Sequence, residues 1–167
     1  MNKGPLKNLP DWNNLLGTVS VLAVSSENGD HKSLRAIFSH TRWQLFEAHD
    51  CQEALNFLQQ QPAGVVICES SLPDGTWRTV LDAVPELPGR PLLIVSSWNP
   101  DAVLWAEVLN IGAYDVLSKP FDSSEVTRVV SLAWLRWKER TVSTRKAPAV
   151  DSGAARAGQV EMRSATA

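Results

Sequence analysis

The sequence lacks the features that mark several common classes of protein. Its 167 residues include two cysteines, Cys51 and Cys68, which lie among apolar neighbours and form no CxxC or Cys/His spacing. We therefore expect two reduced, buried thiols, with neither a disulfide nor a zinc site. The net charge is only −2, with a pI near 5.9, so electrostatics give no reason to expect nucleic-acid binding.

Long apolar runs are also missing. No stretch approaches the roughly 20 apolar residues that cross a membrane, and residues 1–17 lack the apolar core of a signal peptide. The sequence therefore predicts a soluble, cytoplasmic protein. No glycine-rich phosphate loop follows the first predicted strand, since residues 25–30 contain only Gly29, and no GxSxG motif is present. These absences argue against nucleotide binding and serine hydrolase chemistry.

The three histidines show no pattern of metal ligation. His31, His40 and His49 have no ligand spacing to one another or to the cysteines. We expect them at surface positions on a helix, a helix end and a strand end.

What the sequence does contain is a regular alternation of short apolar runs and helical patterns. Apolar runs predict five strands, at residues 19–24, 43–48, 64–68, 92–95 and 114–117. Helical spacing predicts helices at about 30–39, 51–58, 76–84 and 102–111, and one that opens at Asp122 or Ser123. Gly112 is the expected C-terminal cap of the fourth helix. Strands that alternate with helices predict right-handed crossovers and a parallel sheet.

The runs Val-Val-Ile-Cys and Leu-Leu-Ile-Val are apolar on both faces, so helices should cover both sides of the sheet. The predicted fold is a three-layer, doubly wound α/β domain over residues 19–138. Residues 1–18 form a leader. Residues 139–167 lack apolar periodicity and are expected to be a disordered tail.

Polar residues follow the predicted strands at their carboxyl ends, where the working site of such a sheet lies. Ser25 and Ser26 follow the first strand, Glu69 the third, Ser96 the fourth and Lys119 the fifth. Because parallel strands end at one edge, we expect these side chains to lie close together.

Several of these segments together resemble the receiver domain of bacterial response regulators. The resemblance covers about residues 19–136 and depends on Leu-Pro-Asp-Gly at 72–75, Ser96, Gly-Ala-Tyr-Asp at 112–115, and Lys-Pro-Phe at 119–121. It implies a CheY-like, flavodoxin-type sheet with strand order 2-1-3-4-5 and a role in two-component phosphorelay signalling. It also implies a partner such as a histidine kinase or another regulator.

The resemblance also assigns site residues, and not all of them match the family. In the family, an aspartate after strand three accepts a phosphoryl group, and two acids after strand one hold Mg²⁺. A Ser or Thr and a Lys contact the phosphoryl oxygens. Here Ser96 and Lys119 match, but the acceptor position is Glu69 and the acid positions are Ser25 and Ser26.

The resemblance further implies a partner face made by helix four, strand five and helix five. The aromatic switch residue of that strand corresponds to Val116. We expect Trp105, Val116, Leu132 and Leu135 to form an apolar partner or homodimer face.

The missing carboxylates change the expected electrostatics. A usual receiver gathers three carboxylates around one ammonium, whereas Glu69 and Lys119 alone would leave the pocket close to neutral. We therefore expect weak or absent Mg²⁺ binding and no cofactor. One hypothesis is that Glu69 reaches Lys119 and Ser96 and mimics the phosphorylated state. The other is that Glu69 is a partly exposed acid in an inactive site.

The sequence thus predicts an atypical, stand-alone receiver-like domain that acts by protein contact without phosphoryl control and is not an enzyme. Two alternatives stay open. One is a functional receiver phosphorylated through an unusual site that involves Glu27 and Glu69. The other is a small-ligand binder that uses the same cleft.

Overall fold

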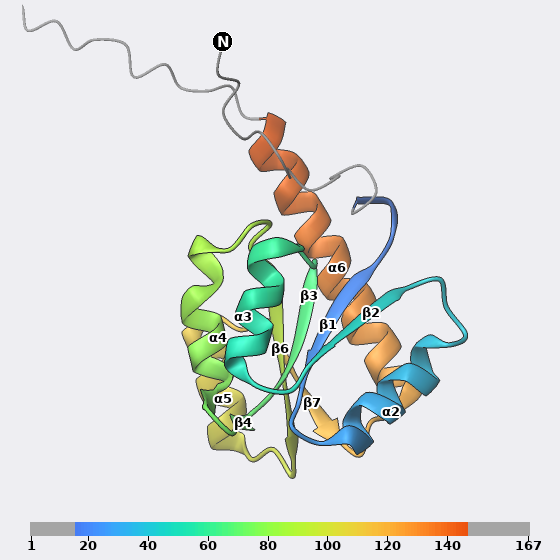
Figure 1. Cartoon of the computed structure of the whole chain (residues 1–167), viewed down its shortest axis with the longest axis vertical. Coiled ribbons are helices and arrows are strands. Elements are labelled where there is room, and N and C mark those ends of the chain that lie inside the picture. Colours follow the sequence, from blue (N-terminus) through green and yellow to red (C-terminus); the bar gives the residue numbers. More distant parts are fainter. Residues whose placement is uncertain (1–15, 147–167) are drawn as a thin grey trace, which may run out of the picture.

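The computed structural model describes residues 16–146. Its centre is a five-stranded parallel sheet with the order β2-β1-β3-β6-β7 (Figure 1). Counted along the chain, this order is 2-1-3-4-5, which confirms the predicted fold. The strands are β1 (Ser20–Val24), β2 (Gln44–Ala48), β3 (Val65–Glu69), β6 (Leu92–Trp98) and β7 (Asp115–Lys119).

Helices cover both faces of the sheet, as the apolar strands predicted (Figure 1). One layer holds α3 (Cys51–Gln60), α4 (Trp77–Ala83) and α5 (Ala102–Ile111), and the other holds α2 (Asn28–Phe38) and α6 (Ser123–Lys146). A 3-10 turn, η1 (Val84–Glu86), follows α4. A small hairpin of β4 (Ser71–Leu72) and β5 (Gly75–Thr76) follows β3 and was not predicted.

Strand β3 divides the core into two clusters. Val66 and Cys68 pack beneath α3, α4 and α5, whereas Val65 and Ile67 pack beneath α2 and α6. This alternation follows from the strand period of two residues. Both cysteines are buried and free, as expected.

Caps at the helix ends agree with the sequence. Gly112 ends α5 in the left-handed conformation with a φ of 112°, which a residue with a Cβ adopts at a cost. The side chain of Asp122 accepts a hydrogen bond from the backbone N–H of Glu125 at 2.8 Å, so this aspartate caps α6.

The close approach of α6 to the sheet explains why residue 64 is a glycine. A Cβ atom on Gly64 would lie 2.9 Å from a ring carbon of Trp137, which is fully buried. The Trp137 indole N–H also donates a 2.7 Å hydrogen bond to the carbonyl of Gly89. This pair of contacts fixes α6 against the amino-terminal edge of the sheet.

The disorder predicted from residue 139 is wrong for residues 139–146, because α6 continues to Lys146. A helix that is already nucleated by a buried stripe extends at little cost through residues with adequate helix propensity. The rest of the predicted tail and residues 1–15 of the predicted leader lie outside the described residues. Within residues 16–146, no helix has both the length and the apolar character needed to cross a membrane.

Candidate functional site

The candidate site lies where the strands end, at the lower edge of the sheet in Figure 1. Ser25 directly follows β1, while Glu69 and Lys119 are the last residues of β3 and β7. The parallel register brings these ends together, as expected.

Lys119 is held between two buried carboxylates. Its Nζ atom lies 2.6 Å from Oδ2 of Asp30 and 3.0 Å from Oε1 of Glu69. The relative exposures of Lys119, Asp30 and Glu69 are 4%, 5% and 8%. The predicted contact between Glu69 and Lys119 is therefore present, and it is joined by a second acid.

Asp30 was not predicted as a site residue, because it lies within a helix and not at a strand end. Asp30 lies in the first turn of α2, on the same buried face as Leu34 and Phe38. The spacing i, i+4, i+8 was the available signal, since a carboxylate on the apolar stripe of a helix needs a buried partner. With Asp30 included, two carboxylates surround one ammonium, so the expectation of a nearly neutral pocket is wrong by one negative charge.

The two serines at the predicted acid positions donate to these carboxylates. Oγ of Ser25 lies 2.6 Å from Oδ2 of Asp30 and 3.1 Å from Oε2 of Glu69. The backbone N–H and the hydroxyl of Ser26 reach the same Glu69 oxygen at 3.2 and 3.3 Å. A hydroxyl carries one proton, so Ser25 donates to one of the two acids at a time.

Ser96 is buried beside Glu69 in the sheet register, but the hypothesised contact between their side chains is not formed. The hydrogen bonds of Glu69 go to Lys119, Ser25 and Ser26 instead.

Trp98 covers the ammonium from the solvent side. Nζ of Lys119 lies 5.4 Å from the centroid of the Trp98 ring, within the range of a cation–π contact. Trp98 is 52% exposed, so its ring has one face toward Lys119 and much of its surface in water.

The ion pairs decide the charge state of the site. Burial raises the pKa of Glu69, but hydrogen bonds and charge from Lys119, helped by Ser25 and Ser26, outweigh burial and hold that pKa below its ordinary value. Burial lowers the pKa of Lys119, yet Asp30 and Glu69 more than compensate and raise it. Glu69 and Lys119 are therefore both charged near neutral pH.

The predicted surface position of His31 is wrong. His31 is fully buried next to Asp30, and its Nε2 atom lies 2.8 Å from the carbonyl oxygen of Ser25. The loop after β1 folds over this position of α2, which removes the imidazole from water. His40 and His49 are exposed, as predicted.

The predicted partner face also needs a correction. Val116 is only 1% exposed and belongs to the core beneath α3, α4 and α5, because both faces of β7 are covered by helices. Trp105 is partly buried against the same core. Leu132 and Leu135 are 48% and 49% exposed on α6.

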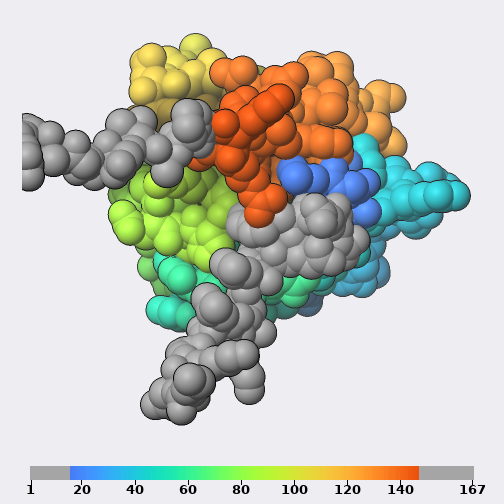
Figure 2. Space-filling model, turned by 90° about the horizontal axis from the view of Figure 1, so that it is seen from above, coloured from blue at the N-terminus to red at the C-terminus, as the bar shows by residue number. Residues whose placement is uncertain are grey.

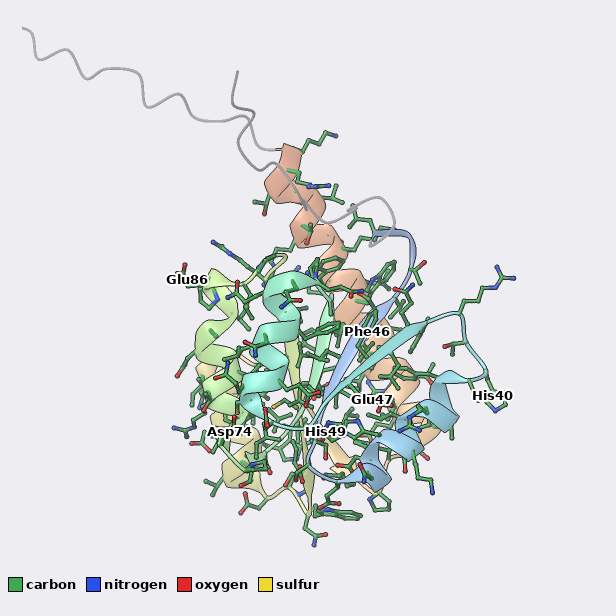
Figure 3. The ribbon with its side chains drawn as sticks, viewed as in Figure 1. His40, Phe46, Glu47, His49, Asp74 and Glu86 are labelled. Atoms are coloured by element: carbon green, nitrogen blue, oxygen red, sulfur yellow. The ribbon has the colours of Figure 1, made fainter. Side chains whose placement is uncertain are left out.

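Asp74 of the Leu-Pro-Asp-Gly segment has a structural role. Its carboxylate accepts hydrogen bonds from the backbone N–H groups of Cys51 and Gln52 at 2.8 and 2.9 Å, so it holds the start of α3. These bonds, the one from Cys51 foremost, lower the pKa of Asp74. Figure 3 shows Asp74 and His49 in the lower part of the molecule, where the strands end.

The residues do not fit the Mg²⁺ ion that the resemblance implies. The family's metal acids are replaced by Ser25 and Ser26, whose hydroxyls face Glu69 as donors. Both remaining carboxylates are bonded to Lys119. Glu27 is exposed, and its backbone N–H, not its carboxylate, bonds to Ser25. Across residues 16–146, no group of three or more His, Cys, Asp or Glu is placed to hold a metal.

Comparison with known proteins agrees with this fold. A family model for the response regulator receiver domain matches residues 21–131. A search of curated protein sequences finds no match. Solved structures similar to the chain include the signal receiver domain of an HD domain-containing protein from Pseudomonas fluorescens, with 24% identity and a TM-score of 0.68. That similarity covers 75% of this chain and 93% of the other.

Two further structures show the same likeness. A CheY-like response regulator receiver domain protein from Methanospirillum hungatei is 16% identical with a TM-score of 0.65, over 74% of this chain and 98% of that one. NtrX from Brucella abortus is 20% identical with a TM-score of 0.68, over 77% of this chain and 30% of that one. At these identities the likeness shows a shared fold.

Proposed function

Because this chain belongs to the response regulator receiver domain family, we propose that it is a two-component signalling module that binds a partner protein without accepting a phosphoryl group. The observation that carries the proposal is the pairing of Lys119 with two buried carboxylates, Asp30 and Glu69. We also propose that the chain catalyses no reaction.

Hydrogen bonding argues against Glu69 as a phosphoryl acceptor. One of its oxygens bonds to Lys119 and the other receives hydrogen bonds from Ser25 and Ser26. An attack on a phosphoryl donor would have to break these bonds in a site that excludes most water. Asp30 would still contact Lys119, but losing the partners of a buried polar group costs about 1–3 kcal/mol.

The charge balance argues against metal-assisted transfer. Phosphoryl transfer relies on a divalent ion to neutralise developing charge. The two carboxylates available for such an ion already surround an ammonium, and Mg²⁺ would have to displace it. Serine hydroxyls at positions 25 and 26 carry no charge that could compensate for this loss.

These contacts support a site held in one arrangement. In the family, Lys and Ser or Thr side chains bind a transient phosphoryl group, whereas here Glu69 supplies a permanent anionic partner to Lys119. The second expected contact, with Ser96, is absent. We therefore propose that partner binding does not depend on a phosphorylation cycle.

Exposed apolar residues on α5 and α6 support contact with a protein. Leu132 and Leu135 are half-exposed on α6, and Trp105 on α5 is partly exposed beyond its core contacts. Exposed apolar groups of this size favour interfaces. We propose that the face formed by α5, β7 and α6 binds a histidine kinase, another regulator or a second copy of the chain.

Intact-mass measurement after incubation with acetyl phosphate and Mg²⁺ tests the proposal. We expect no added phosphate on the wild-type chain, while a phosphorylatable receiver treated in parallel gains one. A stable phosphate on the wild type that is lost in Glu69→Gln would overturn the proposal and favour a functional receiver with an unusual acceptor.

A Mg²⁺ titration followed by tryptophan fluorescence tests the metal argument separately. Trp98 lies against Lys119, so displacement of the ammonium should change its emission. We expect no saturable change. A saturable change that disappears in Trp98→Phe would show metal entry into the site.

A further inference from the structure

A cavity of about 420 Å³ lies at the end of the molecule opposite the Lys119 site. It sits between the loop that leads into β6 and the last turns of α6, and is lined by Leu87, Gly89, Arg90, Arg140, Thr141, Thr144 and Arg145. Figure 2 looks onto this end and shows the red C-terminal turns of α6 beside the lime-green segment around α4 and η1. The function proposed above makes no use of this cavity.

The walls of the cavity are fixed to each other by hydrogen bonds. Trp137 donates from its indole N–H to the carbonyl of Gly89, and the guanidinium of Arg140 donates to the carbonyl of Arg90. Gly89 and Arg90 both have positive φ values, 77° and 45°, which turn the loop back toward α6. The cavity is therefore largely preformed, as small-molecule sites usually are.

The charge of the lining is of one sign. Three of the seven lining residues are arginines and none is acidic. Within residues 16–146, neither Arg90 nor Arg140 forms a salt bridge with an acid. Burial, together with the positive charges of Arg90 and Arg136, lowers the pKa of Arg140. An anion placed among these groups would relieve their repulsion.

We propose that this cavity binds a small anion with two phosphate groups, free or attached to an organic group. Guanidinium groups recognise phosphate by paired, charge-assisted hydrogen bonds, and more than one arginine is available to share a diphosphate. Arg140 uses one donor on the Arg90 carbonyl, and a guanidinium has five. The volume of the cavity lies in the range of ligand sites.

Isothermal titration of the full chain with inorganic pyrophosphate and with ADP, at low salt and without divalent ions, tests the assignment. We expect saturable binding of at least one of them. Arg140→Gln should weaken it roughly tenfold, because one or more charge-assisted hydrogen bonds are lost. Arg90→Gln should have a similar effect, and it serves as the second variant if Arg140→Gln fails to fold.

Arg128→Gln is the matched control. Arg128 is an exposed residue of the same helix, 12 residues or roughly 18 Å before Arg140, and its loss changes the net charge equally. The Arg128→Gln variant should bind both compounds with the affinity of the wild type. Tighter binding of ADP than of pyrophosphate would assign the site to organic diphosphates, and equal or weaker binding would assign it to the inorganic ion.

Two results would overturn the proposal. One is the absence of saturable binding of both compounds to the wild type at millimolar concentration. The other is an equal loss of affinity in Arg128→Gln and in folded Arg140→Gln or Arg90→Gln, which would show only diffuse attraction to a basic helix. Circular dichroism and melting temperature establish that each variant is folded.

Discussion

Lys119 keeps its charge in a place that water barely reaches, because Asp30 and Glu69 both contact its ammonium group. A buried ion pair adds little net stability by itself, but an ion left without its partner is costly. A lysine with two partners differs from a simple pair, since either acid can be removed without leaving the ammonium alone.

A double-mutant cycle measures the coupling free energy between Asp30 and Glu69. Asp30→Asn or Glu69→Gln alone should each lower the free energy of unfolding by about 1–3 kcal/mol, because the other acid still compensates Lys119. The double variant leaves the ammonium unpaired, so its loss should exceed the sum of the single losses by roughly 1 kcal/mol or more. Urea unfolding provides the three values. Additive losses would contradict the two-partner description.

An exposed ion pair provides the matched control for this cycle. Arg35 and Glu47 pair on the surface, with side-chain exposures of 58% and 26%. Such pairs contribute about 0–1 kcal/mol. Glu47→Gln should therefore change the unfolding free energy much less than either change at the buried site.

The lowered pKa of Glu69 predicts a pH dependence of stability. A carboxyl group with a depressed pKa in the folded state contributes its full stabilisation above its unfolded pKa, about 4.3 for Glu. This stabilisation is lost as pH falls from there through the folded pKa. Glu69→Gln has no such proton, so its unfolding free energy should fall less steeply below about pH 4.3. Chemical unfolding at several acidic pH values measures both slopes, and equal slopes would contradict the prediction.

Only part of the site could be predicted from single residues. The contact between Glu69 and Lys119 follows from the rule that parallel strands end at one edge, and it was predicted. Asp30 reaches the same place from inside a helix, so its role needed the helix phase as well as the strand ends. Val116 was assigned to a surface although a strand covered on both faces buries every side chain near its centre.

Among the elements, α6 packs against the amino-terminal edge of the sheet through Trp137. The buried residues of α6 recur at helical spacing and are Val126, Val129, Val130, Ala133 and Trp137. The end of the helix was not predicted, because residues beyond Trp137 have no apolar pattern and only the preceding turns make them helical. The β4–β5 hairpin was missed for a similar reason, since two-residue strands leave no periodicity to detect.

The packing of α6 on Gly64 predicts the effect of a single methyl group. Gly64→Ala would place a Cβ atom 2.9 Å from the Trp137 ring. The ring cannot move away freely, because its indole N–H is bonded to the carbonyl of Gly89. Overpacking of this kind costs typically 1–3 kcal/mol, so the melting temperature should fall.

Gly29→Ala is the control for this change. Gly29 lies in α2, and a Cβ atom there would meet nothing within 4 Å. Because alanine is the better helix former, the free energy of unfolding should stay the same or rise by up to about 1 kcal/mol. The melting temperature should therefore not fall. If both glycine variants lose stability equally, the close approach of Trp137 is not the cause.

For the whole molecule, alternation of strands and helices was enough to predict a parallel sheet with helices on both faces, whereas the strand order was implied by the resemblance to receiver domains. The sheet is apolar on both faces, so few other arrangements bury its strands. The sequence could not predict the basic cavity, because its lining comes from a loop and a helix end that are about 50 residues apart.

The proposed partner face makes a prediction about assembly. If a second copy binds there, wild-type chain should self-associate in sedimentation velocity runs, and the double change Leu132→Ser, Leu135→Ser should abolish this by removing exposed apolar surface. A wild type that is monomeric at all concentrations would contradict a homodimer.

The contacts of Lys119 with both Asp30 and Glu69 also bear on how such a chain can evolve. Under the proposed function, a site of the family's pattern would need an aspartate in place of Glu69 and acids at positions 25 and 26, and Asp30 would still contact the ammonium of Lys119. Under that proposal, no single one of these changes restores the family's set of acids, so each intermediate variant still lacks it. The proposed function therefore implies a loss of phosphoryl acceptance that single substitutions do not reverse.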